Sequence, residues 1–318
     1  ANEAPPAILS VYLGEQLEKM MQDIQAGEFP KTAKGGFMEM GLSQLLKFER
    51  DPRDRNRASP FAFTANRFEF RAVGSSQSVS GPLVAMNTIL ADSLYWIAEH
   101  LEAELASAKD KSAAVMSVLK VVMDKHGNVV FGGNGYSPEW HRMAVAERGL
   151  KNLPTSAEAL PELIAPEVVS LFERMGVLTA VELHSRFEVY SEQYVRSIEL
   201  ETTLMLEMAT TLIYPAAITY LSQLSGASTQ ISSLKLSLDT SVLEAVAKEA
   251  DALLKAIAEL RVLSAKHDFD SVEAHMKYLA HDVRGAMSTL RNHADALESL
   301  IADDIWPLPK YREMLFIK

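Results

Sequence analysis

The stretch Ser241–Leu260, SVLEAVAKEADALLKAIAEL, decides the fold class of this 318-residue chain. Its apolar residues recur every three or four positions, which places them on one face of an α-helix. A second stretch with the same period runs from Met276 to Leu300, after the short connection Asp268–Asp270. Because each apolar face needs a packing partner, we expect these two helices to pair as an antiparallel hairpin. The first face consists of Leu243, Val246, Ala250, Leu253, Ile257 and Leu260.

Most of the remaining chain also has helical patterns. Ser137 followed by Pro138 is typical of a helix N-terminus, and Asp270 with Glu273 is expected to cap the second helix of the hairpin. Pro215 lies inside a helical pattern, where a proline kinks or ends a helix. The patterns cover residues 6–24, 81–105, 112–125 and 181–224.

One segment, Arg67-Phe68-Glu69-Phe70-Arg71, instead alternates polar and apolar residues, which is the period of a β-strand. In a strand, Arg67, Glu69 and Arg71 share one face and the two phenylalanines share the other. We expect the aromatic pair to be a buried anchor and the charged triplet to face a cleft or water. The predicted fold class is therefore α+β, predominantly α.

The charged triplet has two interpretations. A carboxylate between two guanidiniums suits a site for a metal and an anionic ligand, since Glu supplies oxygen to Mg²⁺ and Arg grips phosphate or carboxylate. Alternatively, the triplet is a solvated strand face with ion pairs worth about 0–1 kcal/mol. The clustering of arginines in nineteen residues of an acidic protein favours the anion site. These arginines are Arg53, Arg55, Arg57, Arg67 and Arg71.

Composition excludes several classes of function. The net charge of −11 argues against nucleic acid or an anionic membrane as the main partner. The absence of cysteine excludes thiolate catalysis and disulfides. The most apolar stretch, residues 208–221, is shorter than a membrane span, so we expect a cytoplasmic protein. The segment Phe131–Tyr136 predicts a turn with residues at positive φ rather than a phosphate-binding loop, because it lacks the G-x-G-x-x-G spacing and the Walker lysine.

The run Asn56–Arg71, NRASPFAFTANRFEFR, resembles the nucleotide- and glutamate-binding region of glutamine synthetases, where Asn-Arg-Ser precedes an Arg-x-Glu-x-Arg strand. The opening Glu3-Ala4-Pro5 is similar to the flap over the active site of that family. The resemblance extends over essentially the whole chain and points to the type III class. Its further motifs are Val73–Ser76, Gly133–Tyr136, Trp306–Pro309 and Met314–Lys318.

The resemblance implies roles for five residues. Glu69 matches a strand glutamate that binds the divalent metal, Mg²⁺ or Mn²⁺, on the nucleotide side. Arg71 matches an arginine that contacts substrate glutamate and the transferred phosphoryl group. Arg57 and Arg67 match arginines that bind the nucleotide, and Glu3 matches the flap glutamate that binds ammonium and accepts its proton.

The implied function is an ATP-dependent ligase that joins ammonium to L-glutamate through γ-glutamyl phosphate, in a dodecamer of stacked rings. This sequence differs from the family pattern in two ways. Ala62 stands where the better-known bacterial class has a second arginine. The family's other metal ligands lie upstream of the flap, so we expect this chain, which lacks an initiator Met, to be roughly the carboxy-terminal half of the enzyme. We expect it to be inactive alone and to expose apolar surface near residues 1–80.

This interpretation predicts three parts: 1–110 belongs to the catalytic domain, 111–226 is its helical remainder, and 227–318 is a helical hairpin with a tail. Two alternatives stay open. One is a non-catalytic helical module for assembly, to which the bundle-like region 181–302 is suited. The other is an ATP–carboxylate ligase of the same fold that acts on a different amine.

Overall fold

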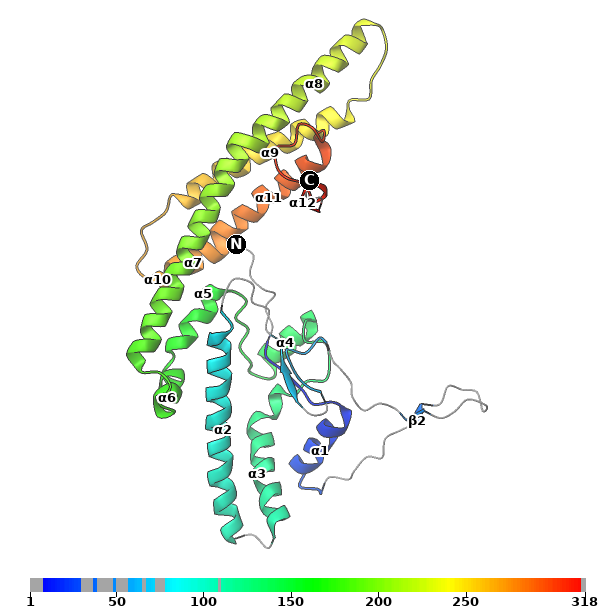
Figure 1. The fold of residues 1–318 in the computed structure, drawn as a ribbon. Coiled ribbons are helices and arrows are strands. Elements are labelled where there is room, and N and C mark those ends of the chain that lie inside the picture. Colours follow the sequence, from blue (N-terminus) through cyan, green and yellow to red (C-terminus); the bar gives the residue numbers. More distant parts are fainter. Residues whose placement is uncertain are drawn as a thin grey trace. The chain divides into compact units, whose positions relative to one another are not determined.

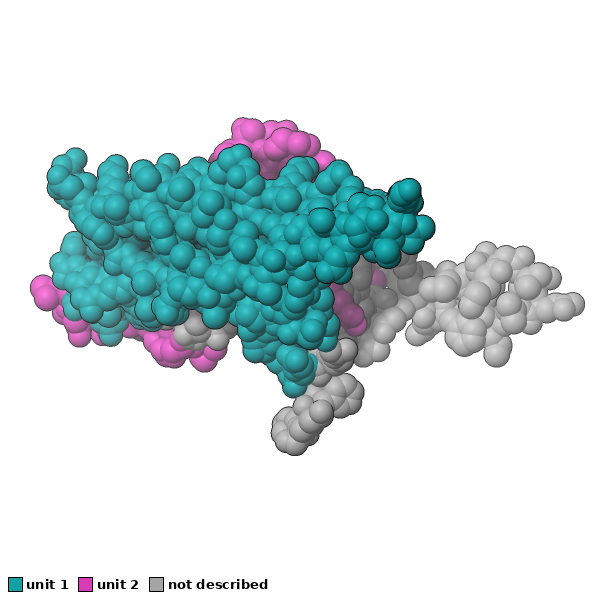
Figure 2. All heavy atoms as spheres, turned by 90° about the horizontal axis from the view of Figure 1, so that it is seen from above, with its two compact units in different colours: residues 1–2, 156–161, 184–318 teal, residues 3–155, 162–183 magenta. Residues whose placement is uncertain are grey.

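The computed structural model of the chain describes residues 8–29, 37–38, 48–49, 57–64, 67–71, 78–107 and 110–315. Helices dominate these residues, and the strands among them are short (Figure 1), which confirms the predicted α-rich α+β class. The chain divides into two compact units, coloured separately in Figure 2. This division follows contacts within the chain and leaves the predicted domain boundaries at residues 110 and 226 as a prediction.

The first unit is a helical bundle whose described part comprises residues 156–161 and 184–315. Helix α9 packs against both α8 and α11, which confirms the predicted pairing of the 241–260 and 276–300 stretches. Its core is closed: Val246, Leu253, Leu260 and Leu297 are completely buried. The helices are α5 (Ser156–Ala159), α7 (Ala180–Met208, from residue 184), α8 (Tyr214–Ser233), α9 (Ser241–Ser264), α10 (Val272–Tyr278), α11 (Arg284–Leu300) and α12 (Tyr311–Leu315).

Pro215 does not end the helix that contains it. A π-helical turn, η3 (Ala209–Ile213), joins α7 to α8, whose first residue, Tyr214, precedes this proline. Because proline has no backbone N–H and its ring clashes with the preceding turn, a wider turn lets the helix continue past it. A second π turn, η4 (Leu279–Val283), joins α10 to α11.

The cap of the second hairpin helix differs from the prediction. Ser271, not Asp270, is the last residue before α10, and its hydroxyl accepts a hydrogen bond from the Ala274 N–H at 3.1 Å. Ser271 has an extended backbone, so its side chain points back at the free N–H groups of the first turn. The predicted pair of Asp270 and Glu273 is therefore wrong by one residue.

The described part of the second unit lies within residues 8–155 and 162–183. It contains a three-stranded sheet with the order β1 (Val11–Tyr12), β4 (Phe61–Phe63), β5 (Phe68–Phe70), where β1 is parallel to β4 and β5 is antiparallel to it. The remaining elements are β2 (Phe37–Met38), β3 (Phe48–Glu49), α1 (Glu15–Gln25), α2 (Ser80–Ser107), α3 (Lys111–His126), η1 (Gly127–Val129), α4 (Pro138–Ala146), η2 (Leu160–Ile164, from residue 162) and α6 (Pro166–Arg174).

The helix predicted over residues 6–24 forms only in its second half. Val11 and Tyr12 form strand β1, and α1 begins at Glu15. Gly14, with φ of +82°, separates the two elements, since this backbone conformation favours glycine and breaks a helix. Pairing with β4 therefore overrides the helical period of the first apolar residues.

The turn at residues 133–135 contacts the segment that leads into strand β4. Gly135 donates its N–H to the carbonyl of Ala58 at 3.0 Å, and a Cβ at this glycine would lie 2.6 Å from that oxygen. The predicted positive φ is wrong, because the described glycines with positive φ lie elsewhere in the chain. Glycine is required here for close approach of two backbones. Ser137 caps α4 as predicted, accepting from the Trp140 N–H at 3.1 Å.

Candidate functional site

The candidate site is the charged face of strand β5. The register of the sheet places Glu69 opposite Ala62, which in turn pairs with Tyr12 of β1. Tyr12 and Ala62 are buried, at 5% and 0% exposure. Arg67 and Arg71 both form ion pairs with Glu69. The structure therefore confirms that Arg67, Glu69 and Arg71 lie together on one face.

Each oxygen of the Glu69 carboxylate contacts one guanidinium. Arg67 Nη2 lies 3.3 Å from Oε1, and Arg71 Nη2 lies 3.0 Å from Oε2. Arg71 also donates to the Ser59 carbonyl at 3.4 Å, and its backbone N–H donates to the Pro60 carbonyl at 2.8 Å. Arg67 has a largely exposed side chain, at 70%. Arg71 is thus fixed to the residues directly before β4, whereas Arg67 extends into solvent.

The two arginines set the charge of Glu69. The hydrogen bond from Arg71 is the largest influence and holds the pKa of Glu69 below its usual value, while partial burial opposes this change and the charge of Arg67 supports it. Glu69 is therefore ionised at neutral pH. The site is a carboxylate flanked by two permanent cations, with a net positive charge that attracts an anion.

The opposite face of the sheet differs from the prediction. Phe68 and Phe70 are not a buried anchor, because their exposed fractions are 46% and 38%. They pack on the phenylalanines of β4 instead: the Phe68 ring stacks on Phe61 at 5.1 Å and lies 5.2 Å from Phe63, and Phe70 meets Phe61 edge-on at 6.1 Å. These four rings shield one another but stay partly open to solvent.

This aromatic face agrees with the predicted exposure of apolar surface near residues 1–80. In the same part of the chain, Phe29 is 65% exposed and Val79 is 71% exposed. These residues add exposed apolar side chains to the aromatic face within the described part of residues 1–80.

The other predicted site residues are less well placed. Arg57 is exposed in the turn before β4 and forms no ion pair with any residue that the structure describes. Glu3, Arg53 and Arg55 lie outside the described residues. Ala62 is fully buried beside Glu69, so an arginine at this position would require the sheet to change. The structure therefore unites three of the five predicted residues.

The described residues do not form a magnesium site by themselves. Mg²⁺ requires about six oxygen ligands in octahedral geometry. Glu69 supplies one carboxylate, and both of its oxygens contact arginine. In the described part of the chain, no group of three or more His, Asp or Glu side chains gathers at a point. The arrangement by itself suits an anion rather than a cation.

Sequence reasoning missed two supporting residues, Ser59 and Tyr12. Ser59 contributes its backbone carbonyl to Arg71, and a backbone acceptor leaves no signal in residue type. Tyr12 lies in the strand whose pairing with β4 completes the sheet beneath Glu69. Because its apolar neighbours fit the helical period of residues 6–24, the sequence predicted a helix at this position and not a strand.

Comparison with known proteins finds similarity to glutamine synthetases. Residues 114–232 match a family described as the glutamine synthetase C-terminal domain. Over the whole chain, 36% of residues are identical to a type-3 glutamine synthetase of Dictyostelium discoideum. Glutamine synthetases of Bacteroides fragilis (strain YCH46) and Butyrivibrio fibrisolvens are 33% and 34% identical over 100% and 99% of this chain.

The match covers less than half of each relative. The chain spans 44% of the Dictyostelium protein and 45% of each bacterial protein. It corresponds to their carboxy-terminal half.

Proposed function

The chain belongs to the glutamine synthetase family, and from this premise we propose that it is the carboxy-terminal part of an ATP-dependent glutamate–ammonia ligase. This ligase would make glutamine from L-glutamate, ammonium and ATP through γ-glutamyl phosphate. One observation carries the proposal: Arg67, Glu69 and Arg71 lie on one face of β5, in the Arg-x-Glu-x-Arg pattern of the family.

In this proposal the two arginines that flank β5, Arg67 and Arg71, have different roles. Arg71 would contact substrate glutamate and the phosphoryl group, and Arg67 and Arg57 would bind the nucleotide. Phosphoryl transfer depends on positioning and on neutralising negatively charged oxygens, which guanidiniums do well. The hydrogen bond of Arg71 to the Ser59 carbonyl fixes its guanidinium, which supports a role in positioning substrate glutamate and the phosphoryl group. The exposed side chain of Arg67 supports contact with a nucleotide that arrives from solvent.

In this proposal Glu69 would be the ligand that this chain supplies to a divalent metal, Mg²⁺ or Mn²⁺. When bound, such an ion would neutralise charge on the phosphate oxygens. The described residues supply one carboxylate, so the other ligands would have to come from elsewhere in the complete protein. Glu3, proposed to bind ammonium and accept its proton, would also act only in that protein. We therefore propose that this chain alone does not make glutamine.

The proposed setting follows from the same resemblance and from charge. We propose a cytoplasmic homo-oligomer of stacked rings. The net charge of −11 supports neither nucleic acid nor an anionic membrane as a partner. A ligase of the same fold that uses another amine would be recognised by activity with that amine and none with ammonium.

A second candidate function is assembly without catalysis. It is favoured by the bundle of the first unit, whose core is closed without any residue of the charged strand. In that case the bundle would hold subunits together, and β5 would be a solvated strand. Both candidates predict an oligomer, but only the first predicts that Glu69 matters for activity.

The test compares two glutamate substitutions in the complete protein that contains this chain. Glu69→Gln keeps the size of the side chain but removes its charge, and we expect it to lower the rate of glutamine formation by about 100-fold or more, as for other preorganised charges at a reacting centre. Glu162→Gln is the matched control, because Glu162 forms an exposed ion pair with Lys151 in the same unit. Equal activity of both variants would overturn the proposal.

A further inference from the structure

Helix α2 of the second unit contacts α3 and α6 with one of its sides (Figure 1). Residues at three successive turns mark this inner side. Thr88 is buried, at 4% exposure. One turn further, Asp92 pairs with Arg174 of α6 at 2.7 Å. After another turn, the Lys125 ammonium of α3 lies 5.1 Å from the centre of the Trp96 ring.

The opposite side of α2 is apolar over about six turns. Residues spaced three or four apart lie on one side of a helix, and nine residues of α2 share the side opposite Asp92. We call this set the α2 face: Leu83, Met86, Asn87, Leu90, Leu94, Ile97, Ala98, Leu101 and Leu105. Asn87 is its one polar member, and the amide of this residue donates to the Leu83 carbonyl at 2.8 Å. Four of the leucines are strongly exposed, at 56% (Leu83), 49% (Leu90), 63% (Leu94) and 42% (Leu105).

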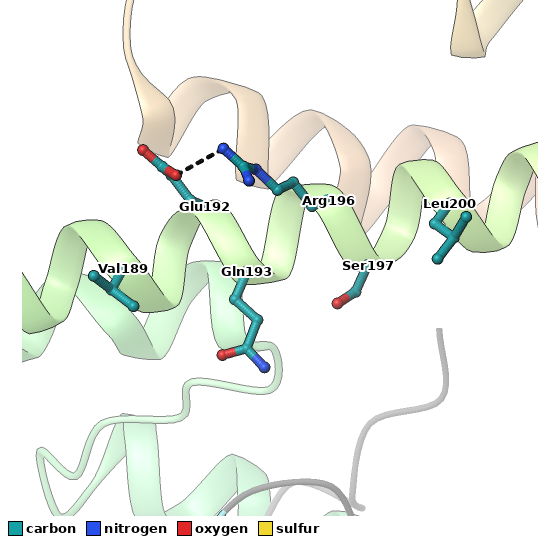
Figure 3. Close-up of a pocket in the computed structure, with 6 residues that line it drawn as sticks. All are labelled: Val189, Glu192, Gln193, Arg196, Ser197 and Leu200. Carbon is teal, nitrogen blue, oxygen red and sulfur yellow. Dashed lines mark hydrogen bonds and ion pairs between the residues drawn. The ribbon is translucent and has the colours of Figure 1, made fainter.

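Helix α7 has exposed apolar residues too, but polar side chains separate them. A shallow pocket of about 400 Å³ along this helix (Figure 3) is lined by Val189 and Leu200 together with Glu192, Gln193, Arg196 and Ser197. Among the described helices, the continuous helix Ala180–Ser233 is the one long and apolar enough to cross a membrane by length and composition, and 22% of its most apolar window is buried. Single apolar residues among polar ones are ordinary on a protein surface, whereas the apolar residues of the α2 face adjoin one another.

We propose that the α2 face is a docking surface for the amino-terminal part of the complete protein, which covers it with an apolar segment that carries Lys or Arg. This inference rests on the proposed function, in which ligands from that part reach Glu69 in the same unit. The chain spans 44–45% of the relatives that it matches and corresponds to their carboxy-terminal half. More than half of such a protein is therefore available to supply the covering segment.

The charges of α2 define the chemistry of this segment. Glu102 and Glu104 lie on the two flanks of the α2 face near its end, and neither forms an ion pair with a residue that the structure describes. Helix α2 contains no Lys or Arg. The same face of a second copy therefore offers these carboxylates no opposite charge in either a parallel or an antiparallel pairing. An anionic membrane would repel them, whereas a segment with basic side chains would pair with them.

The size of the α2 face favours a segment of the same polypeptide over a separate molecule. From Leu83 to Leu105 the helix rises about 33 Å, and a helix is about 10 Å wide, so each side of the contact would cover about 330 Å². The total of about 660 Å² is below the roughly 1,200 Å² at which stable interfaces between separate proteins begin. A segment joined through the backbone needs less area, because the covalent connection gives it a high effective concentration.

The first experiment measures the accessibility of position 94 in the 318-residue chain and in the complete protein. The chain contains no cysteine, so Leu94→Cys introduces one thiol into it, and mass spectrometry of the peptide that contains this thiol follows its labelling by a maleimide. We expect labelling about 100-fold slower in the complete protein, where the thiol reacts only when the covering segment opens locally. Arg142→Cys is the matched control, because the Arg142 side chain is 74% exposed on α4 of the same unit, and it should be labelled at the same rate in both.

Three results would overturn the proposal: equal labelling at position 94 in the two proteins, the same slowing at position 142, or labelling in the chain alone that slows as its concentration rises. The last result would show that a second copy covers the α2 face. The proposed function is tested separately by Glu69→Gln. A complete protein that makes glutamine but is labelled rapidly at position 94 would refute the docking surface and leave the proposed ligase unaffected.

A second experiment identifies the occupant in the complete protein. Leu94 is replaced by the photoreactive residue p-benzoylphenylalanine, which bonds on illumination to the side chains that it contacts. We expect a product with the mass of one polypeptide, in which peptide mapping places the link in an apolar segment upstream of Ala1 that contains Lys or Arg. A product with the mass of two polypeptides, a link to any residue of positions 1–318, a link to an acidic segment, or no link at all would overturn the proposal.

Discussion

The two units of the chain protect their interiors to different degrees. In the bundle, α9 lies between α8 and α11, and residues such as Leu253 and Leu260 are completely sealed from water. Among the described residues of the second unit, the buried cluster formed by Ile8, Trp140 and Ala144 is small, while Phe68 and Phe70 on the sheet stay half exposed. The unit with the better core carries no candidate chemistry, and the unit with the candidate site has a sheet face that is not covered.

The difference shows that the two units are held together by different interactions. The bundle is held by apolar packing, which is strong and tolerant of sequence. The charged strand is held by its pairing with β4 and by hydrogen bonds to the residues just before β4: Gly135 N–H to the Ala58 carbonyl, and Arg71 to the carbonyls of Ser59 and Pro60. Stability and proposed function are therefore separable by mutation.

The largest effect should come from a core leucine of the bundle. Leu253→Ala removes a fully buried side chain, which costs about 2–5 kcal/mol of unfolding free energy. Phe68→Ala removes a larger ring but one that is 46% exposed, so its cost should be about 1 kcal/mol. Hydrogen exchange followed by mass spectrometry measures the loss of unfolding free energy in each compact unit separately. Equal costs would contradict the difference between the two interiors.

A smaller effect is expected from adding one methyl group to a glycine in each unit. Gly135→Ala places a carbon 2.6 Å from the Ala58 carbonyl and should destabilise the second unit by about 1–3 kcal/mol. Gly226→Ala in α8 meets nothing within 4 Å and should stabilise the bundle by about 0.4–1 kcal/mol. Thermal unfolding followed by circular dichroism compares the two. A neutral result at residue 135 would show that this close contact does not hold the sheet.

The smallest effect concerns pH and belongs to the bundle. Burial lowers the pKa of His275 below its usual value of 6.5, although the Glu199 carboxylate, 3.6 Å from its Nε2, opposes the change. The folded chain then binds fewer protons at this residue than the unfolded chain, so stability rises with pH and falls as the pH drops below about 6.5. His275→Gln should flatten this fall between pH 7 and 5.

Urea unfolding at several pH values measures the change. His126→Gln, at an exposed position on α3 in the second unit, is the control and should leave the slope as it is. Equal slopes for the wild-type chain and His275→Gln would show that this histidine does not contribute to the acid sensitivity of the bundle.

Much of the fold could be predicted from periodicity. The hairpin of α9 with α10 and α11 follows from apolar residues such as Leu253 and Leu290, because a helical face with that spacing has to be buried. The strand at Phe68–Phe70 follows from alternation. The strand at Val11–Tyr12 could not be predicted, since its residues also fit a helix and only pairing with distant β4 decides between them.

The site shows a similar limit. That Arg67, Glu69 and Arg71 share a face follows from the period of a strand, and the structure confirms it. Which arginine is anchored does not follow, because Ser59 holds Arg71 through a backbone carbonyl twelve residues away. Exposed apolar surface near residues 1–80 was predicted, but not that Phe68 belongs to it, since alternation separates two faces of a strand without showing which face the rest of the chain covers.

One measurement tests the central claim most directly: glutamine formed from ATP, L-glutamate and ammonium by the purified 318-residue chain, beside the complete protein that contains it. We predict glutamine from the complete protein and none above background from the chain alone, because Glu69 is the one carboxylate that the described site supplies. Glutamine formed by the chain alone would contradict the account, since these residues would then complete a catalytic site without any further part of the protein.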